Sequence, residues 1–195
     1  MKQKPKVQKY CLMAPKGAYT DFHIDFGGSS VWYHVMKGEK VFYLIEPSES
    51  NLLLYDRWMQ SSNRLQSFFA DQVARCYRLV VKEGMTILLP SGWIHAVFTP
   101  EDTLVFGGNF LHNYSICTQL QIYEFEIKHK MEARFLFPQF KTLNWLAAGH
   151  LINVLTSINQ TRSIAPVYLT KGLKSLWFSL KQWKTSPLVI IFYEV

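Results

Sequence analysis

The sequence has few cysteines and no long apolar run. Its cysteines, Cys11, Cys76 and Cys117, lie far apart, and no C-x-x-C pair occurs, which excludes a cysteine-based zinc finger. An odd, scattered set is typical of a reducing intracellular compartment. The start lacks the apolar segment of a secretory signal peptide. The apolar end, residues 187–195, is too short to span a membrane, and a buried terminal strand is one interpretation of it.

Acidic residues are fewer than basic ones. The 14 Asp and Glu residues against 21 Lys and Arg residues give a formal charge of +7. A basic balance favours acidic partners such as nucleic acid or chromatin, although a solvated basic surface explains it equally well. The lysines at the start could serve nuclear import or belong to a frayed terminus. The hydrophobic fraction of 49% excludes a disordered chain, and 195 residues suit one domain with a small appendage.

The first two thirds of the sequence predict an all-β domain. Short apolar segments are separated by turns containing Gly and Pro, as in a sandwich or barrel. Residues 48–60 predict a helix with Ser48 as its N-cap. The strands are expected at residues 6–13, 18–26, 31–35, 40–47, 76–82, 85–90, 95–100 and 102–110, with a closing strand at 119–128.

From about Lys128 the apolar spacing changes to three and four residues. This spacing predicts helices over residues 140–158 and 168–183, with Pro166 in the break between them. We expect an antiparallel helix pair packed on the β domain. The predicted domains are therefore a β-barrel over residues 1–127 and a helical extension over residues 128–195.

The stretch YTDFHIDFGG, residues 19–28, raises the question of a metal site. Alternate residues of a strand share a face, so His23 and Asp25 could take adjacent positions around one metal. His95, which opens a strand after the turn PSGW, is the best third candidate. Two histidines and a carboxylate form the facial triad of non-haem Fe(II) oxygenases. The alternative, a hydrogen-bonded core histidine beside a strand-end cap, has about equal support from these residues.

An Fe(II) oxygenase of this type needs 2-oxoglutarate, and a cation and a hydroxyl must hold its far carboxylate. Lys40 begins a strongly apolar strand, and a buried lysine needs an anionic partner. Thr20 and Tyr33 could donate hydroxyl hydrogen bonds. The alternatives are an exposed turn position for Lys40, like Lys37, and ordinary strand propensity for the two hydroxyl residues.

Three segments, YTDFHIDFGGSSVWYHVMKGEKVFYLI, PSGWIHAV and FGGNFLH, closely resemble the JmjC-domain histone lysine demethylases. The nearest branch is the one with an upstream PHD finger, close to the F-box-containing branch. The likeness covers about residues 4–127 and implies a mainly β fold, a double-stranded β-helix of the jelly-roll or cupin type, followed by helices. It implies Fe(II) and 2-oxoglutarate as cofactors. The implied residues are His23, Asp25 and His95 for the metal, Thr20, Tyr33 and Lys40 for 2-oxoglutarate, and Asn109 near the methylated lysine of the substrate.

The resemblance also implies a reaction and a location. It implies a nuclear dioxygenase that demethylates mono- or dimethylated lysine of histone H3 tails, such as histone H3 lysine 9, by N-methyl hydroxylation and formaldehyde release. Chromatin and the H3 tail are the expected partners, with no membrane and no sequence-specific nucleic-acid motif. A JmjC hydroxylase of protein side chains and a non-catalytic chromatin-binding fragment are the alternatives. Because Met1 stands just before the first strand and no PHD finger is present, we expect an N-terminally truncated chain.

Overall fold

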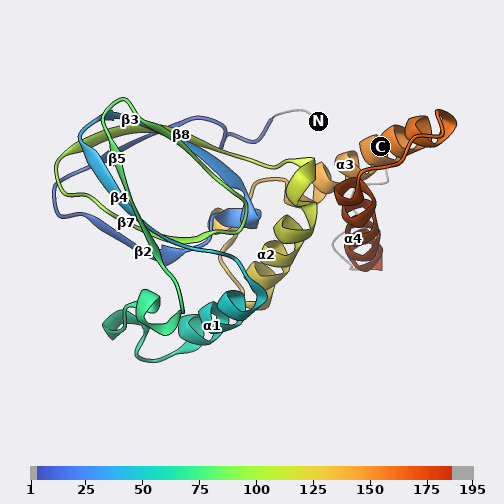
Figure 1. Ribbon diagram of the computed structural model, residues 1–195. Coiled ribbons are helices and arrows are strands. Elements are labelled where there is room, and N and C mark those ends of the chain that lie inside the picture. The colour runs from blue at the N-terminus through green and yellow to red at the C-terminus, as the bar shows by residue number, and fades with distance from the viewer. Residues whose placement is uncertain (1–3, 186–195) are drawn as a thin grey trace. The chain divides into compact units, whose positions relative to one another are not determined.

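The computed structural model describes residues 4–185 (Figure 1). These residues form two compact units. The first contains residues 4–25 and 29–110, and the second contains residues 26–28 and 111–185. The terminal strand interpreted from residues 187–195 lies outside the described residues. No helix in the described part of the chain is long and apolar enough to cross a membrane.

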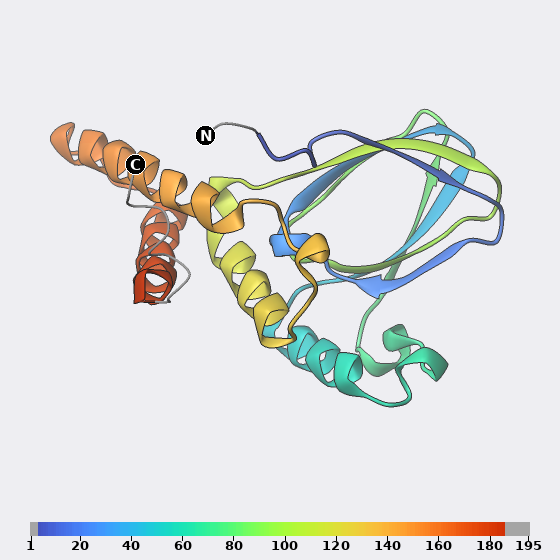
Figure 2. The same cartoon turned by 180° about the vertical axis from the view of Figure 1, so that it is seen from behind.

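The first unit is built from two antiparallel β-sheets, which Figures 1 and 2 show from opposite sides. Within the described residues, one sheet has the strand order β1-β8-β3-β6 and the other has the order β2-β7-β4-β5. The strands are β1 Tyr10–Ala14, β2 Tyr19–His23, β3 Ser30–Lys37, β4 Glu39–Ile45, β5 Tyr77–Lys82, β6 Thr86–Leu89, β7 Ile94–Phe98 and β8 Thr103–Phe110. These two sheets confirm the predicted jelly-roll architecture, and each of the eight strands corresponds to a predicted segment.

The inner faces of the two sheets enclose a core of β-branched and aromatic side chains. In β3, Val31, Tyr33 and Val35 alternate with more exposed neighbours and point inward, as expected for a strand with one buried face. Phe42 of β4 reaches the same cluster from the other sheet and meets Tyr33 edge to face, with ring centroids 5.2 Å apart. The core therefore lies between the sheets, and Tyr33, one of the predicted site residues, belongs to it.

The outer side of β2 is covered by an aromatic cluster. Helix α1, Glu49–Gln60, begins after Ser48, whose hydroxyl accepts the backbone N–H of Asn51 at 3.2 Å, which confirms the predicted helix and N-cap. Trp58 of α1 is buried and packs on Phe22 of β2 with ring centroids 6.5 Å apart. Short 3-10 turns η2, Arg64–Gln66, and η3, Phe69–Gln72, follow α1. This packing anchors the strand that ends at His23.

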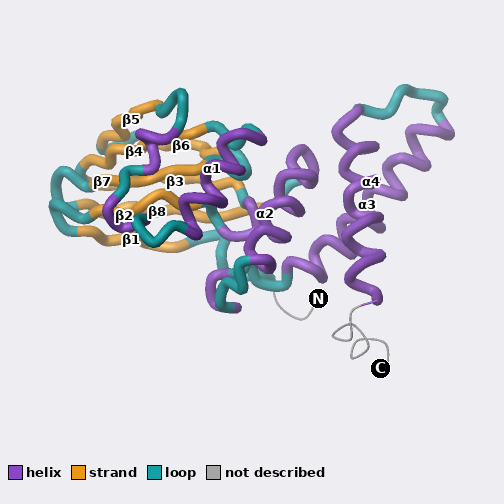
Figure 3. Tube along the Cα trace, turned by 90° about the horizontal axis from the view of Figure 1, so that it is seen from below, coloured by secondary structure: helices purple, strands orange, loops and turns teal. Residues whose placement is uncertain are grey.

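The second unit is helical (purple in Figure 3). Its helices are α2 Ile116–Lys128, α3 Phe140–Gln160 and α4 Val167–Thr185, and its 3-10 turns are η1 Phe26–Gly28, η4 Asn113–Ser115 and η5 Ala133–Phe135. Both α3 and α4 confirm predicted helices. Pro166 directly precedes α4, as the predicted break requires. Tyr123 of α2 stacks on Phe140 of α3 at 4.2 Å between centroids and meets Trp183 of α4 edge to face.

The closing strand expected at residues 119–128 is wrong, because these residues belong to α2. Leu120 and Ile122 are two residues apart, as are Phe125 and Ile127, which resembles strand alternation, but the buried residues follow a helical spacing. That set is Ile116, Gln119, Leu120, Ile122, Tyr123 and Glu126. Glu and Gln are also good helix formers. The two units divide the chain at Phe110 and Leu111, whereas the sequence placed the boundary after Ile127 because α2 was interpreted as a strand.

Candidate metal centre

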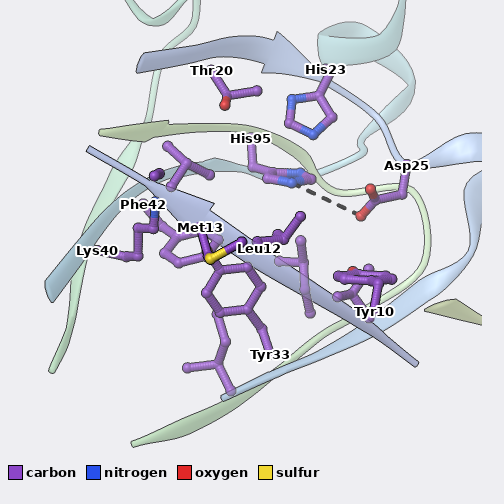
Figure 4. Close-up of a pocket in the computed structure, with 15 residues that line it drawn as sticks. Tyr10, Leu12, Met13, Thr20, His23, Asp25, Tyr33, Lys40, Phe42 and His95 are labelled. Carbon is purple, nitrogen blue, oxygen red and sulfur yellow. Dashed lines mark ion pairs between the residues drawn. The ribbon is translucent and has the colours of Figure 1, made fainter. Parts of the chain in front are cut away.

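Three side chains from different parts of the first unit converge at one end of the second sheet. His23 ends β2 and His95 lies in β7, and the two are direct cross-strand partners. Their rings lie 4.1 Å apart between centroids. Asp25 follows β2, and its Oδ2 lies 3.9 Å from Nε2 of His95 (dashed in Figure 4). One nitrogen or oxygen of each residue lies within 4.8 Å of the others, so a single ion could contact all three.

Backbone carbonyls fix the orientation of both imidazole rings. Nδ1 of His23 donates to the carbonyl oxygen of Asp21 at 2.8 Å, and Nδ1 of His95 donates to that of Trp93 at 3.1 Å. A carbonyl oxygen accepts hydrogen bonds only, so each Nδ1 carries the proton. Each Nε2 therefore keeps its lone pair. This is the tautomer that a metal-ligating histidine needs, held by the kind of support that such ligands have.

Burial also favours a cation at this position. Desolvation raises the pKa of Asp25, while the nearby His23 and a hydrogen bond from Asn109 act in the opposite direction. Desolvation lowers the pKa of His95 well below its usual value, and the neighbouring His23 lowers it further, against the hydrogen bond to Trp93. Neutral imidazole nitrogens beside a carboxylate in a partly dry site are a donor set suited to a divalent first-row metal. The residues present thus fit Fe(II).

The path of the chain differs from the prediction in one respect. The sequence argument placed Asp25 on a strand with His23, but β2 ends at His23 and Asp25 lies in the loop before η1. Strand alternation therefore does not explain why the two side chains meet. The register of β2 against β7 shifts between Thr20 and His23. A bulge of this kind reorients side chains, so Thr20 and His23, three residues apart, both line the same cavity.

The cavity beside these residues has a volume of about 280 Å³ and is drawn in Figure 4. Thr20, Tyr33 and Lys40, predicted to bind 2-oxoglutarate, line it together with the three candidate ligands. Tyr33 is buried, and desolvation raises the pKa of its hydroxyl. The remaining lining residues are Tyr10, Leu12, Met13, Ala14, Val31, Phe42, Ile87, Leu89 and Val97. The structure therefore brings six of the seven predicted site residues to one cavity.

Lys40 is a buried cation in this cavity. It exposes only 4% of its surface, which rules out the alternative of an exposed turn position. Its Nζ donates to the hydroxyl of Thr99 at 2.6 Å, and desolvation lowers its pKa. A hydroxyl carries no negative charge. The partner that Lys40 has among the described residues therefore does not neutralise its ammonium group. An anionic ligand in the cavity would do so.

Asn109 occupies a different place from the other predicted residues. Its side chain is buried, donates to Oγ of Ser29 at 2.9 Å and hydrogen-bonds to Asp25, but it is not among the residues that line the cavity. It therefore supports a candidate metal ligand, and its contact with a substrate stays a prediction.

The sequence interpretation missed two residues of this site. Thr99 follows β7 at an even spacing from His95, and this spacing was the available signal for a shared face. Tyr10 begins β1 and lines the cavity, and desolvation raises the pKa of its hydroxyl with a smaller contribution from Asp25. No local pattern of the sequence brings Tyr10 to the site, because it reaches the cavity through the pairing of β1 with β8.

The fold and the three-ligand cluster together define a jelly-roll protein with a candidate facial metal site. Comparison with known families gives a match to the JmjC domain, described as a hydroxylase, over residues 10–110, and to the Jumonji helical domain over residues 114–189. The chain belongs to the JmjC domain family, as the sequence resemblance predicted.

Curated relatives have similar sequences over most of this chain. Lysine-specific demethylase 7A of Danio rerio is 53% identical over 92% of the chain, and that of Homo sapiens is 49% identical over 95%. Lysine-specific demethylase 2A of Xenopus tropicalis is 53% identical over 73%. The chain spans 21%, 20% and 12% of the lengths of these three relatives.

Proposed function

We propose that this chain carries the catalytic domain of an Fe(II)- and 2-oxoglutarate-dependent histone lysine demethylase. The observation that carries the proposal is the buried Lys40 in one cavity with His23, Asp25 and His95. A buried ammonium group whose hydrogen-bond partner among the described residues is a hydroxyl, beside a three-ligand cluster, suits a ligand that chelates a metal at one end and carries a carboxylate at the other. The names of the relatives, lysine-specific demethylases, support the same activity.

The candidate ligands would hold the iron, and other residues would hold the cosubstrate. Bound iron would supply the oxidising chemistry: dioxygen gives one oxygen atom to succinate as 2-oxoglutarate loses carbon dioxide, and the other to the N-methyl carbon, whose C–N bond then breaks to release formaldehyde. Lys40 and the hydroxyls of Thr20 and Tyr33 would bind the far carboxylate of 2-oxoglutarate. Charge-assisted hydrogen bonds of this kind are the strong ones.

The apolar part of the cavity has a role of its own. Phe42, Leu89 and Val97 line it beside Lys40 and keep water away from the reacting atoms. Asn109, hydrogen-bonded to Asp25, would hold this carboxylate in place. The proposed substrate is a mono- or dimethylated lysine of the histone H3 tail, such as histone H3 lysine 9, and the proposed location is chromatin in the nucleus.

Formaldehyde release tests the proposal. The chain is loaded with Fe(II) and 2-oxoglutarate and incubated with H3 tail peptides that carry mono- or dimethyl-lysine at position 9. The expected result is formaldehyde, with a loss of methyl mass from the peptide and an equal amount of succinate. Reactions without 2-oxoglutarate, and with His95→Ala, serve as controls and should give neither product.

Two other results would replace this proposal. A gain of one oxygen atom on a protein side chain without methyl loss would identify a JmjC protein hydroxylase. Folded protein that binds neither Fe(II) nor 2-oxoglutarate would identify a non-catalytic chromatin-binding fragment, and His23→Ala would then leave its properties unchanged.

A further inference from the structure

The hydrogen bond between Lys40 and Thr99 joins a residue of the cavity wall to one behind it. The Nζ–Oγ1 distance is 2.6 Å, and the two residues expose only 4% and 2% of their surface. Lys40 lines the cavity, whereas Thr99 is not among the lining residues. Figure 4 shows Lys40 at the opposite end of the lining residues from Asp25. Thr99 would therefore act on a ligand in this cavity through Lys40 rather than by direct contact.

The backbone and the side chain of Thr99 are both held in place. Its N–H donates to the carbonyl oxygen of Ala18 at 2.9 Å, and its carbonyl oxygen accepts the N–H of Gly17 at 2.7 Å. Pro100 follows, and a proline restricts the residue before it to extended conformations. A β-branched side chain such as that of threonine has few χ1 rotamers. The hydroxyl of Thr99 is therefore a fixed acceptor.

Strand register brings this acceptor to Lys40. Strands β4 and β7 are antiparallel, with Val41 opposite Phe98, so one step further along the same register Lys40 stands opposite Thr99. Side chains at directly opposite positions of antiparallel strands lie close enough to interact. A lysine side chain has a long flexible stem, and its rotamer entropy is among the largest of any residue. A hydrogen bond to a fixed hydroxyl therefore limits where the ammonium group of Lys40 can lie.

The neutral charge of the Thr99 hydroxyl matters as much as its position. An ammonium group has three N–H donors, and a bond to one hydroxyl leaves the others for a ligand. A carboxylate in place of this hydroxyl would form a buried ion pair with Lys40 and would repel an anionic ligand. Threonine thus holds the ammonium group of Lys40 without cancelling its charge.

We propose that Thr99 is a positioning residue that orients the ammonium group of Lys40 toward the far carboxylate of 2-oxoglutarate. This inference rests on the proposed function and adds to it a residue outside the cavity wall. Because the Lys40–Thr99 hydrogen bond exists before the ligand arrives, Lys40 loses little rotamer freedom when it binds the carboxylate. The effect of Thr99 on 2-oxoglutarate affinity should therefore depend on the presence of Lys40.

A double-mutant cycle on 2-oxoglutarate binding tests the proposal. Anaerobic calorimetry measures the dissociation constants of Fe(II) and of 2-oxoglutarate for the full chain. Thr99→Val keeps the shape of the side chain and removes the hydroxyl, and it should raise the dissociation constant of 2-oxoglutarate about three- to tenfold, since Lys40 must then be immobilised on binding. Fe(II) affinity should stay unchanged. Thr99→Ser should restore 2-oxoglutarate binding, and Thr99→Val should have no further effect in a Lys40→Met background.

Matched variants separate the hydroxyl from its charge and from general packing. Thr99→Asn keeps a neutral oxygen, whereas Thr99→Asp has the same shape and adds a negative charge beside Lys40. Thr99→Asp should bind 2-oxoglutarate at least tenfold more weakly than Thr99→Asn. Thr103→Val is the control for loss of a buried threonine hydroxyl, because Thr103 hydrogen-bonds to the carbonyl oxygen of Ala14 and does not line the cavity. Circular dichroism checks that each variant is folded.

The possible failures of the two proposals differ. If Thr99→Val binds 2-oxoglutarate as tightly as the wild type, or weakens its binding equally with and without Lys40, the positioning role is overturned and the proposed function stands. Equal affinities of Thr99→Asp and Thr99→Asn, or weak binding by Thr99→Ser, would also overturn it. A wild-type chain that binds Fe(II) but no 2-oxoglutarate would instead overturn the proposed function, and the role of Thr99 with it.

Discussion

His23 and His95 face each other across β2 and β7 as direct cross-strand partners, with ring centroids 4.1 Å apart. Each ring donates through Nδ1 to a backbone carbonyl of its own strand region, and so both present Nε2 to one point. The backbone thus prepares the ligand geometry before any metal arrives, which lowers the cost of binding.

Removal of either histidine should abolish tight metal binding. We expect His23→Ala or His95→Ala to lower the affinity for Fe(II) by more than the 10- to 100-fold that loss of a supporting partner costs. Anaerobic calorimetry or metal analysis after dialysis measures this effect. His34→Ala is the matched control, because His34 hydrogen-bonds to Thr86 and does not line the cavity. Equal metal content in all three variants would contradict the assignment.

Lys40→Met should selectively weaken 2-oxoglutarate binding. Loss of a charge-assisted hydrogen bond costs about 1.5–3 kcal/mol, which corresponds to a 10- to 150-fold rise in the dissociation constant. The melting temperature should stay the same or rise, because a buried ammonium group whose partner in the described part of the chain is a neutral hydroxyl is costly in the ligand-free protein. Lys37→Met, at an exposed position, is the control. Unchanged 2-oxoglutarate affinity in Lys40→Met would remove Lys40 from the site.

Phe22→Ala should destabilise the first unit through the cavity that it leaves. Phe22 has no exposed surface and meets the rings of Trp58, Phe68 and Phe69. The expected loss in unfolding free energy is about 3–5 kcal/mol, measured by urea denaturation. Leu88→Ala, at a strand position with 71% exposure, should change stability by less than about 0.5 kcal/mol. A loss of similar size in both variants would contradict the role of the aromatic cluster.

Glu126 should make the stability of the helical unit depend on pH. It is 3% exposed, and one of its oxygens accepts the N–H of Gly27 at 2.7 Å, while the other has no hydrogen-bond partner among the described residues. Burial raises the pKa of Glu126 to about 7 from its ordinary 4.5, against a lowering by the Gly27 hydrogen bond. Tyr123 is the titratable neighbour; burial raises the pKa of its hydroxyl, and Glu126 adds a smaller contribution in the same direction.

The sign of this effect follows from the two pKa values. Between about pH 4.5 and 7 the folded state holds a proton that the unfolded state has released, so stability falls as the pH rises through this window and is constant above it. The Glu126→Gln variant keeps an oxygen for Gly27 and removes the titration. The stability of the wild type minus that of Glu126→Gln should therefore fall by roughly 1–3 kcal/mol between pH 5 and 7.5.

Parallel urea titrations at several pH values measure this difference. Glu124→Gln, an exposed position on the same helix, controls for the loss of one negative charge. Parallel stability curves for the wild type and Glu126→Gln across the whole range would show that Glu126 does not titrate there.

Local sequence patterns were sufficient to predict an element where its segment has a single apolar side. Alternation in β3 and capping by Ser48 depend on neighbouring residues, so the sequence predicted both elements. The same reasoning misassigned α2, because its apolar residues also alternate locally. Burial of Ile116, Leu120 and Tyr123 within the helical unit decides in favour of the helix, and that burial is a tertiary property.

The sequence by itself determined the jelly-roll class and the residue types of the candidate site. The tertiary structure decided which of these residues meet. Because the register of β2 shifts, Thr20 and His23 both line one cavity. The loop after β2 places Asp25 within 3.9 Å of His95. The pairing of β4 with β7 places Lys40 within hydrogen-bonding distance of Thr99. Side chains distant in the sequence converge only through strand register, and no local pattern contains that information.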